Sequence, residues 1–187
     1  MLRVYALLCC LSTLFSGCAT HQQYETALSY GRIVAGSRIT LHQELVIPAN
    51  QVRLFLQRGQ VLTNNFDQYY PHCNFEIRTL SDHAWSIVPD EFLVTRVRQG
   101  FEEVVSLKPI KVAALGATAL YYAVYPMVSR YIHLYLASER QPDVMRLTCH
   151  GAFDELPDAD LPTVDEIGEA LGGLATLQRY PKPGVIK

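Results

Sequence analysis

The sequence contains none of the short motifs that mark the commonest catalytic sites. It has no Gly-x-Ser-x-Gly turn, no glycine-rich phosphate-binding loop and no His-Glu-x-x-His helix. Ser81, Asp82 and His83 are the residue types of a catalytic triad, but three consecutive residues cannot adopt its relay geometry. We therefore expect a protein that is not an enzyme and that needs no cofactor.

Excess charge and repeated segments are also lacking. The 187 residues include 16 basic and 18 acidic side chains, a net charge of −2, which gives no indication of nucleic-acid binding. No segment repeats at a fixed period, and no low-complexity block is present. The length suffices for one domain with a sizeable core.

The N-terminus has the anatomy of an export signal. Arg3 precedes an apolar stretch, residues 4–15, that is too short to span a bilayer but suits the apolar part of a signal peptide. Small residues follow and lead directly to a cysteine, in the order Ser16-Gly17-Cys18. This arrangement predicts cleavage close to Cys18.

The run Leu14-Phe15-Ser16-Gly17-Cys18 resembles the lipobox of bacterial lipoproteins, with Phe15 where that family usually has leucine. The resemblance implies that residues 1–17 are removed, that Cys18 is lipidated, and that residues 18–37 form the anchor and tether. Ala19 stands where an aspartate usually retains such proteins at the inner membrane. We therefore expect attachment to the outer membrane, facing the periplasm. Export as a soluble protein and an uncleaved anchor are the alternatives.

Two cysteines remain once those of the leader and the anchor are set aside, Cys73 and Cys149. An even pair in an oxidising compartment is most simply a disulfide, and both residues lie in alternating segments that can point them inward. The neighbouring His72 and His150 raise the alternative of a zinc site. Adjacent strand residues point to opposite faces, however, so both imidazoles would face away from the sulfurs. We predict a disulfide and no metal site; free buried thiols are the third alternative.

Period-two alternation dominates residues 38–178 and predicts one mainly β domain, an antiparallel β-sandwich or open barrel. Thr163 and Glu166 have the capping-box spacing and predict a short C-terminal helix that ends at Gly172-Gly173. Residues 179–187 are expected to form a mobile tail. The expected strands are 38–47 paired with 51–58, then 73–80, 85–88, 92–98, 101–107, and a hairpin of 131–137 with 144–149.

Two aromatic segments are candidate interaction surfaces. The turn-rich segment 63–71 is expected to be a surface loop. The uncharged segment 112–129 is expected to be a buried or partly exposed apolar hairpin; docking on a membrane or partner, and a true membrane span, are the alternatives. Their aromatic candidate residues are Phe66, Tyr69, Tyr70, Tyr121, Tyr122 and Tyr125.

The acidic stretch 154–169 lacks the spacing of a calcium-binding loop, so we expect a solvated acidic face there rather than a cation site. Together these patterns predict a lipid-anchored envelope lipoprotein with a non-catalytic interaction or structural role. Its expected partners are the membrane, through the lipid on Cys18, and an envelope protein. The alternative is a periplasmic carrier that binds an apolar ligand or lipid inside the β domain.

Overall fold

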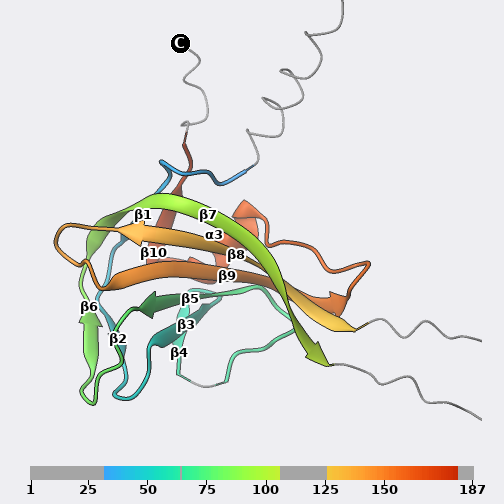
Figure 1. The fold of residues 1–187 in the computed structure, drawn as a ribbon, viewed down its shortest axis with the longest axis horizontal. Coiled ribbons are helices and arrows are strands. Elements are labelled where there is room, and N and C mark those ends of the chain that lie inside the picture. The colour runs from blue at the N-terminus through green and yellow to red at the C-terminus, as the bar shows by residue number, and fades with distance from the viewer. Residues whose placement is uncertain (1–31, 64, 106–125, 181–187) are drawn as a thin grey trace, which may run out of the picture. The chain divides into compact units, whose positions relative to one another are not determined.

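The computed structural model describes residues 32–63, 65–105 and 126–180 (Figure 1). The chain divides into two units, Met1–Ile33 and Val34–Lys187. Only Arg32 and Ile33 of the first unit are described, and all strands and the helix belong to the second. The leader, Cys18, residues 112–125 and most of the C-terminal tail lie outside the described residues. No helix in the described ranges is long and apolar enough to cross a membrane.

The fold is mainly β, as the alternating pattern predicts. Eight antiparallel strands form one curled sheet in the order β10-β1-β7-β8-β9-β5-β3-β4, and β2 pairs with β6 separately. The strands are β1 (Arg38–Leu41), β2 (Leu45–Ile47), β3 (Arg53–Gln57), β4 (Gln60–Leu62), β5 (His72–Ile77), β6 (Trp85–Ile87), β7 (Asp90–Val105), β8 (Met127–Ala137), β9 (Val144–Glu155) and β10 (Ala175–Gln178).

One face of the large sheet buries an apolar core. Alternate positions of the central strands and of β2 and β6 supply side chains that are almost fully buried, among them Leu45, Leu54, Phe75, Ile87, Phe92, Leu134 and Leu147. Helix α3 (Val164–Leu171) covers this core with Ile167 and Leu171. The helix contacts β3 and β5 near one edge of the sheet and β10 at the other. It therefore connects strands near the two edges of the large sheet.

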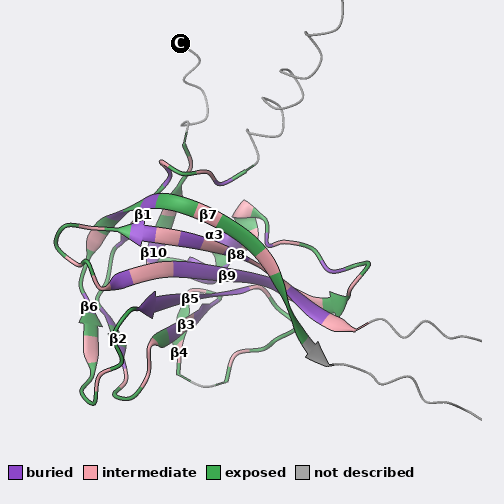
Figure 2. Cartoon of the chain, in the orientation of Figure 1, coloured by how far each residue is buried: buried purple, intermediate pink, exposed green. Residues whose placement is uncertain are grey.

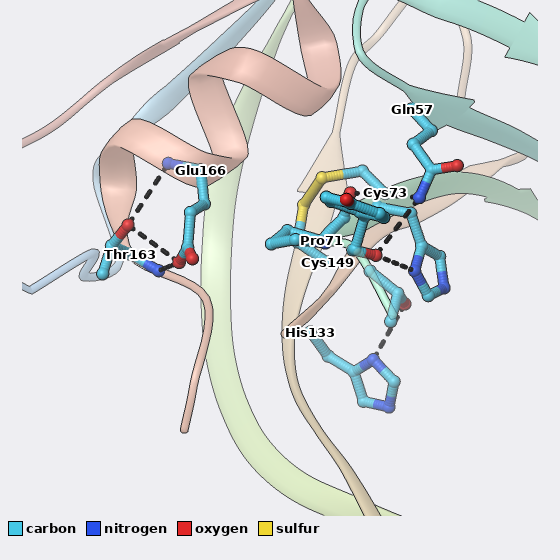
Figure 3. The surroundings of a disulfide bond; sticks show 10 residues. Gln57, Pro71, Cys73, His133, Cys149, Thr163 and Glu166 are labelled. Atoms are coloured by element: carbon cyan, nitrogen blue, oxygen red, sulfur yellow. Dashed lines mark hydrogen bonds between the residues drawn. A yellow bond between two sulfur atoms is a disulfide. The ribbon is translucent and has the colours of Figure 1, made fainter. Parts of the chain in front are cut away.

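Both ends of α3 follow from their local sequence. The Thr163 side chain accepts a hydrogen bond from the Glu166 amide, and the Glu166 carboxylate accepts one from the Thr163 amide, so the capping box is confirmed (Figure 3). The helix ends before Gly172, whose φ of 53° favours glycine. The helix thus begins and ends where the sequence predicts.

The predicted pairing of residues 38–47 with 51–58 is wrong. The first segment breaks after Leu41, where the His42 amide donates a hydrogen bond to the Leu174 carbonyl. Strand β1 lies between β10 and β7, whereas β2 pairs with β6. The alternation identifies the apolar face of a strand, but it does not specify which strand lies beside it.

Other strand boundaries also differ from the expectation. The segments expected at 92–98 and 101–107 form a single long strand, β7. Its pairing with β8 shifts register at two places. The β8–β9 hairpin is confirmed and is longer than predicted. Strands β4 and β10 were not anticipated, because their three and four residues are too short to display a period.

Candidate functional site

The disulfide marks the side of the sheet that faces the core. Cys73 in β5 and Cys149 in β9 are register partners, and they are bonded with their Cα atoms 4.0 Å apart. Both residues are fully buried, and Figure 3 shows the bond on the side of the strands that faces α3. The predicted disulfide is therefore confirmed. His72 and His150 lie on the opposite face, as strand alternation requires.

That opposite face carries polar and aromatic side chains in three rows, which we call the outer rows. Each row crosses the sheet through residues that are register partners on adjacent strands. The charged row is Arg96, Tyr135, Arg146, Glu76 and Arg53. The middle row is Arg98, His133, Thr148, Asn74 and Phe55. The histidine row is Gly100, Tyr131, His150 and His72.

The charged row is a continuous chain of contacts across five strands. Glu76, which is 5% exposed, binds the Nε atoms of both Arg53 and Arg146. The Arg96 guanidinium lies 3.9 Å from the centre of the Tyr135 ring. Burial acts to lower the pKa of Arg146, but the hydrogen bond and charge of Glu76 outweigh it and raise that pKa. Arg146 therefore stays charged although it is partly buried.

The histidine row is packed and uncharged. The rings of His72 and His150 stack with centroids 4.8 Å apart and an interplanar angle of 2°, and Tyr131 lies 5.5 Å from His150. Burial lowers the pKa of His72. Burial, and then the charges of His72 and His133, lower the pKa of His150 to about 3. These imidazoles are neutral at pH 7, which allows them to stack without repulsion.

The glycine of this row has a packing role. Gly100 is the register partner of Tyr131, and a Cβ on Gly100 would lie 2.5 Å from the Tyr131 hydroxyl oxygen. A larger residue would therefore displace the tyrosine ring from its place beside His150.

The structure brings together a serine and a histidine that the sequence does not juxtapose. The Ser129 hydroxyl lies 3.2 Å from His150 Nδ1, and it also donates to the Gly151 carbonyl oxygen at 3.3 Å. A catalytic pair needs a basic imidazole oriented by a third group. His150 is instead stacked on another histidine, its pKa is about 3, and Ser129 is 1% exposed. The pair therefore satisfies buried polar groups rather than activating a nucleophile.

The middle row combines hydrogen-bonding groups with one unsatisfied atom. His133 Nδ1 lies 2.8 Å from the Thr148 hydroxyl (Figure 3). Burial, followed by the charge of Arg146, lowers the pKa of His133 to about 4. Asn74 is 3% exposed, and its side-chain oxygen has no hydrogen-bond partner within the described structure. Such an acceptor is destabilising by about 1–3 kcal/mol unless it meets a donor.

The loop before β5 folds over the end of the outer rows. The Gln57 side chain holds this loop by donating to the carbonyl of Asp67 at 2.8 Å and accepting from its amide at 2.9 Å. Phe66 stacks on Phe55, with centroids 4.5 Å apart, and lies 4.2 Å from the His72 ring. Both faces of β5 are consequently buried along its length (Figure 2).

The aromatic residues proposed from the sequence have different environments. Tyr69 and Tyr70 are exposed, at 68% and 47%, whereas Phe66 is half-buried against the outer face. The Arg58 guanidinium lies 4.0 Å from the Tyr70 ring centre. Tyr121, Tyr122 and Tyr125 fall outside the described residues, and so does Cys18.

Two further sequence features can be placed. His83 contacts Asp82 at 2.9 Å, but Ser81 accepts from the His83 amide, and both His83 and Asp82 are well exposed, so these residues form a turn. Within the described ranges, no three His, Cys, Asp or Glu side chains are grouped so that they could hold a metal ion.

Comparison with known proteins adds no relative: no protein-family model, curated protein or solved structure matches this chain. Geometry alone therefore supports a functional interpretation of the candidate site.

The outer rows were not anticipated from the sequence. A partial signal exists, because Arg96 and Arg98 alternate with Val97 in one strand, and His72 and His150 each adjoin a cysteine. Alternation thus indicates which residues share a face within a strand. Only the register between strands aligns them into rows.

Proposed function

We propose that this protein is a lipid-anchored lipoprotein of the cell envelope, with a non-catalytic binding role at the periplasmic face of the outer membrane. The observation that supports binding best is the asymmetry of the large sheet. One face is buried in the core; on the other, the loop before β5 covers one end of the outer rows, and Arg53, Arg96 and Arg98 are exposed. The lipobox resemblance at Cys18 supports the anchor.

The composition of the outer rows suits recognition. Arginine and tyrosine are the residue types that recur at interaction sites, because they combine contact area with directed hydrogen bonds. The exposed rings of Tyr69 and Tyr70 belong to the same loop as Phe66, which stacks on Phe55. The buried histidines are neutral and packed, so they support the surface rather than supply a general base.

Photo-crosslinking in intact cells tests this proposal. A photoreactive residue replaces Tyr69, and a matched variant carries it at Val46, which is also exposed, at 50%, but lies on β2 outside the outer rows. We expect discrete adducts with an envelope component from position 69 and none from position 46. Equal labelling at both positions would contradict a specific contact surface. Lipid that co-purifies with the protein after detergent exchange would favour the carrier instead.

A further inference from the structure

We propose that two copies of this chain pair through the unpaired edge of strand β7 and so join their large sheets into one. The proposal goes beyond the binding role above, because it names a different surface and a second copy of the chain as its occupant. Three features of this edge support the pairing: its length, the order of its side chains and an exposed phenylalanine.

Strand β7 is paired along one side but only at its start on the other. Strand β1 meets it from Asp90 to Leu93, and two further backbone hydrogen bonds at Val94 end this contact. Residues 96–103 follow β8 without a register shift, and on their other side they have no strand partner among the described residues (Figure 1). Such an edge presents unpaired amides and carbonyls to another strand. The end strands of the sheet, β4 and β10, have only three and four residues.

The side chains along this edge are complementary to themselves when a second copy runs in the opposite direction. Residues 96–103 read Arg-Val-Arg-Gln-Gly-Phe-Glu-Glu. A twofold axis through Gln99 places Arg96 opposite Glu102 of the partner subunit, and it places Val97 opposite Phe101 of the partner subunit. Opposite charges and apolar side chains that face each other directly across an antiparallel pair stabilise it. The symmetry forms each of these pairs twice.

Strand alternation limits the registers that are possible. Residues directly opposite each other share a face of the sheet, so the axis must pass through a residue and not between two. An axis through Gly100 would set the carboxylate of Glu103 against the apolar side chain of Val97. The axis through Gln99 avoids this conflict, and it places Arg98 opposite a glycine, which leaves room for the long side chain.

Pairing at this edge would cover apolar surface without accumulating charge. Phe101 is 58% exposed, and Figure 2 shows that this part of β7 is mostly exposed. The two arginines and two glutamates of residues 96–103 give a net charge of zero. None of these four side chains forms an ion pair with a described residue: Arg96, Arg98, Glu102 and Glu103. Their charges are therefore available to a second copy.

The expected assembly is a reversible dimer. A twofold pairing uses the β7 edge of each copy once, so it closes at two subunits and does not extend into a filament. A single pair of strands buries less area than an obligate interface, so we expect a dissociation constant in the micromolar range.

Disulfide crosslinking of the full-length chain in detergent tests the register. In the proposed dimer Gln99 lies opposite Gln99 of the partner subunit, with Cα atoms about 5 Å apart, which suits a disulfide. Gln99→Cys should therefore link two copies under mild oxidation. Glu103→Cys is the matched control, because Glu103 is exposed on the same strand, and its two copies would lie about 27 Å apart. Equal linkage of both variants, or none from Gln99→Cys, would overturn the inference.

A charge exchange tests the pairing without a covalent bond. Sedimentation equilibrium in density-matched detergent measures the dissociation constant of the dimer. Arg96→Glu places like charges opposite each other twice and should raise this constant about tenfold. Adding Glu102→Arg restores the opposite charges and should return it to within about threefold of wild type. The contact of Arg96 with the Tyr135 ring stays lost in both variants, so the recovery isolates the pairing.

Arg38→Glu is the control for net charge, since Arg38 lies on β1 and is exposed outside this edge. It should leave the dissociation constant within about twofold. A monomeric wild-type chain at all concentrations, or a double variant that dimerises no better than Arg96→Glu, would overturn the inference. A photoreactive residue at Gln99 should give a dimer adduct in intact cells, and an adduct with a different protein instead would also overturn it. Crosslinking at position 69 tests the proposed function independently of these outcomes.

Discussion

The buried histidines show how single residues determine the chemistry of the outer face. His72 and His150 stack because neither ring is charged, and they are uncharged because burial penalises the imidazolium form. Because burial lowers their pKa values, these imidazoles are poor general bases at pH 7. Their effect is therefore on stability, and it depends on pH.

We predict that acid destabilises the fold through these residues. The pKa of His150 is about 3 in the folded protein against 6.5 for an unperturbed histidine, so the unfolded state binds more protons below pH 6.5. The contribution of His150 to the free energy of unfolding is therefore fully present above pH 6.5 and is lost as the pH falls toward 3. At pH 4 the loss from this group is about 3 kcal/mol. Urea unfolding at several pH values measures the slope.

Two variants separate this effect from general acid unfolding. His150→Gln should reduce the pH dependence of the unfolding free energy between pH 6.5 and 4.5, whatever its effect at pH 7. His83→Gln replaces an exposed histidine and should leave the slope unchanged. The same slope in both variants would contradict a neutral, buried His150.

A close backbone approach at Gly172 gives a second prediction. A Cβ at this position would overlap the Cα of Gly59 in the turn between β3 and β4, and its φ of 53° also disfavours other residues. Gly172→Ala should therefore lower the free energy of unfolding by about 2 kcal/mol or more. Gly173→Ala, where nothing lies within 4 Å of the added Cβ, should change it by less than half as much.

At the scale of elements, the disulfide joins two central strands that are distant in sequence. Cys73 and Cys149 are 76 residues apart, so their bond restricts a long loop of the unfolded chain. Reduction, or the pair Cys73→Ala and Cys149→Ala, should lower stability by about 4 kcal/mol in the chain-entropy model. Thermal unfolding with and without reductant measures the change. Reductant should have no effect on the double variant; a reductant effect there would point to another cause.

At the scale of the whole molecule, the lipid anchor that we propose at Cys18 bears on where the protein acts. We predict that labelled palmitate enters the wild-type protein and that Cys18→Ser abolishes the labelling, because the thioether requires the Cys18 sulfur. Two or more acyl chains make release from a membrane negligible, since each buried methylene contributes about 0.8 kcal/mol. Palmitate in the Cys18→Ser protein would show that another residue carries the lipid. The distribution of the protein between outer and inner membrane fractions then tests the expected location at the outer membrane.

The sequence by itself determined the features that depend on neighbouring residues. Alternation indicated a mainly β fold and the inward face of Cys73 and Cys149, and the spacing of Thr163 and Glu166 located the helix. These signals are local because a side chain's direction follows from its own backbone and a cap from residues within one turn.

Only the tertiary structure decided which strands lie side by side. Strand β1 pairs with β7 and β10 rather than with its neighbour in sequence, and the register of β7, β8, β9, β5 and β3 aligns the outer rows. Each row combines residues far apart in the chain, such as His72 with His150. The physical reason is that pairing and register are fixed by burial of the whole core and by long-range hydrogen bonds, which no single segment encodes.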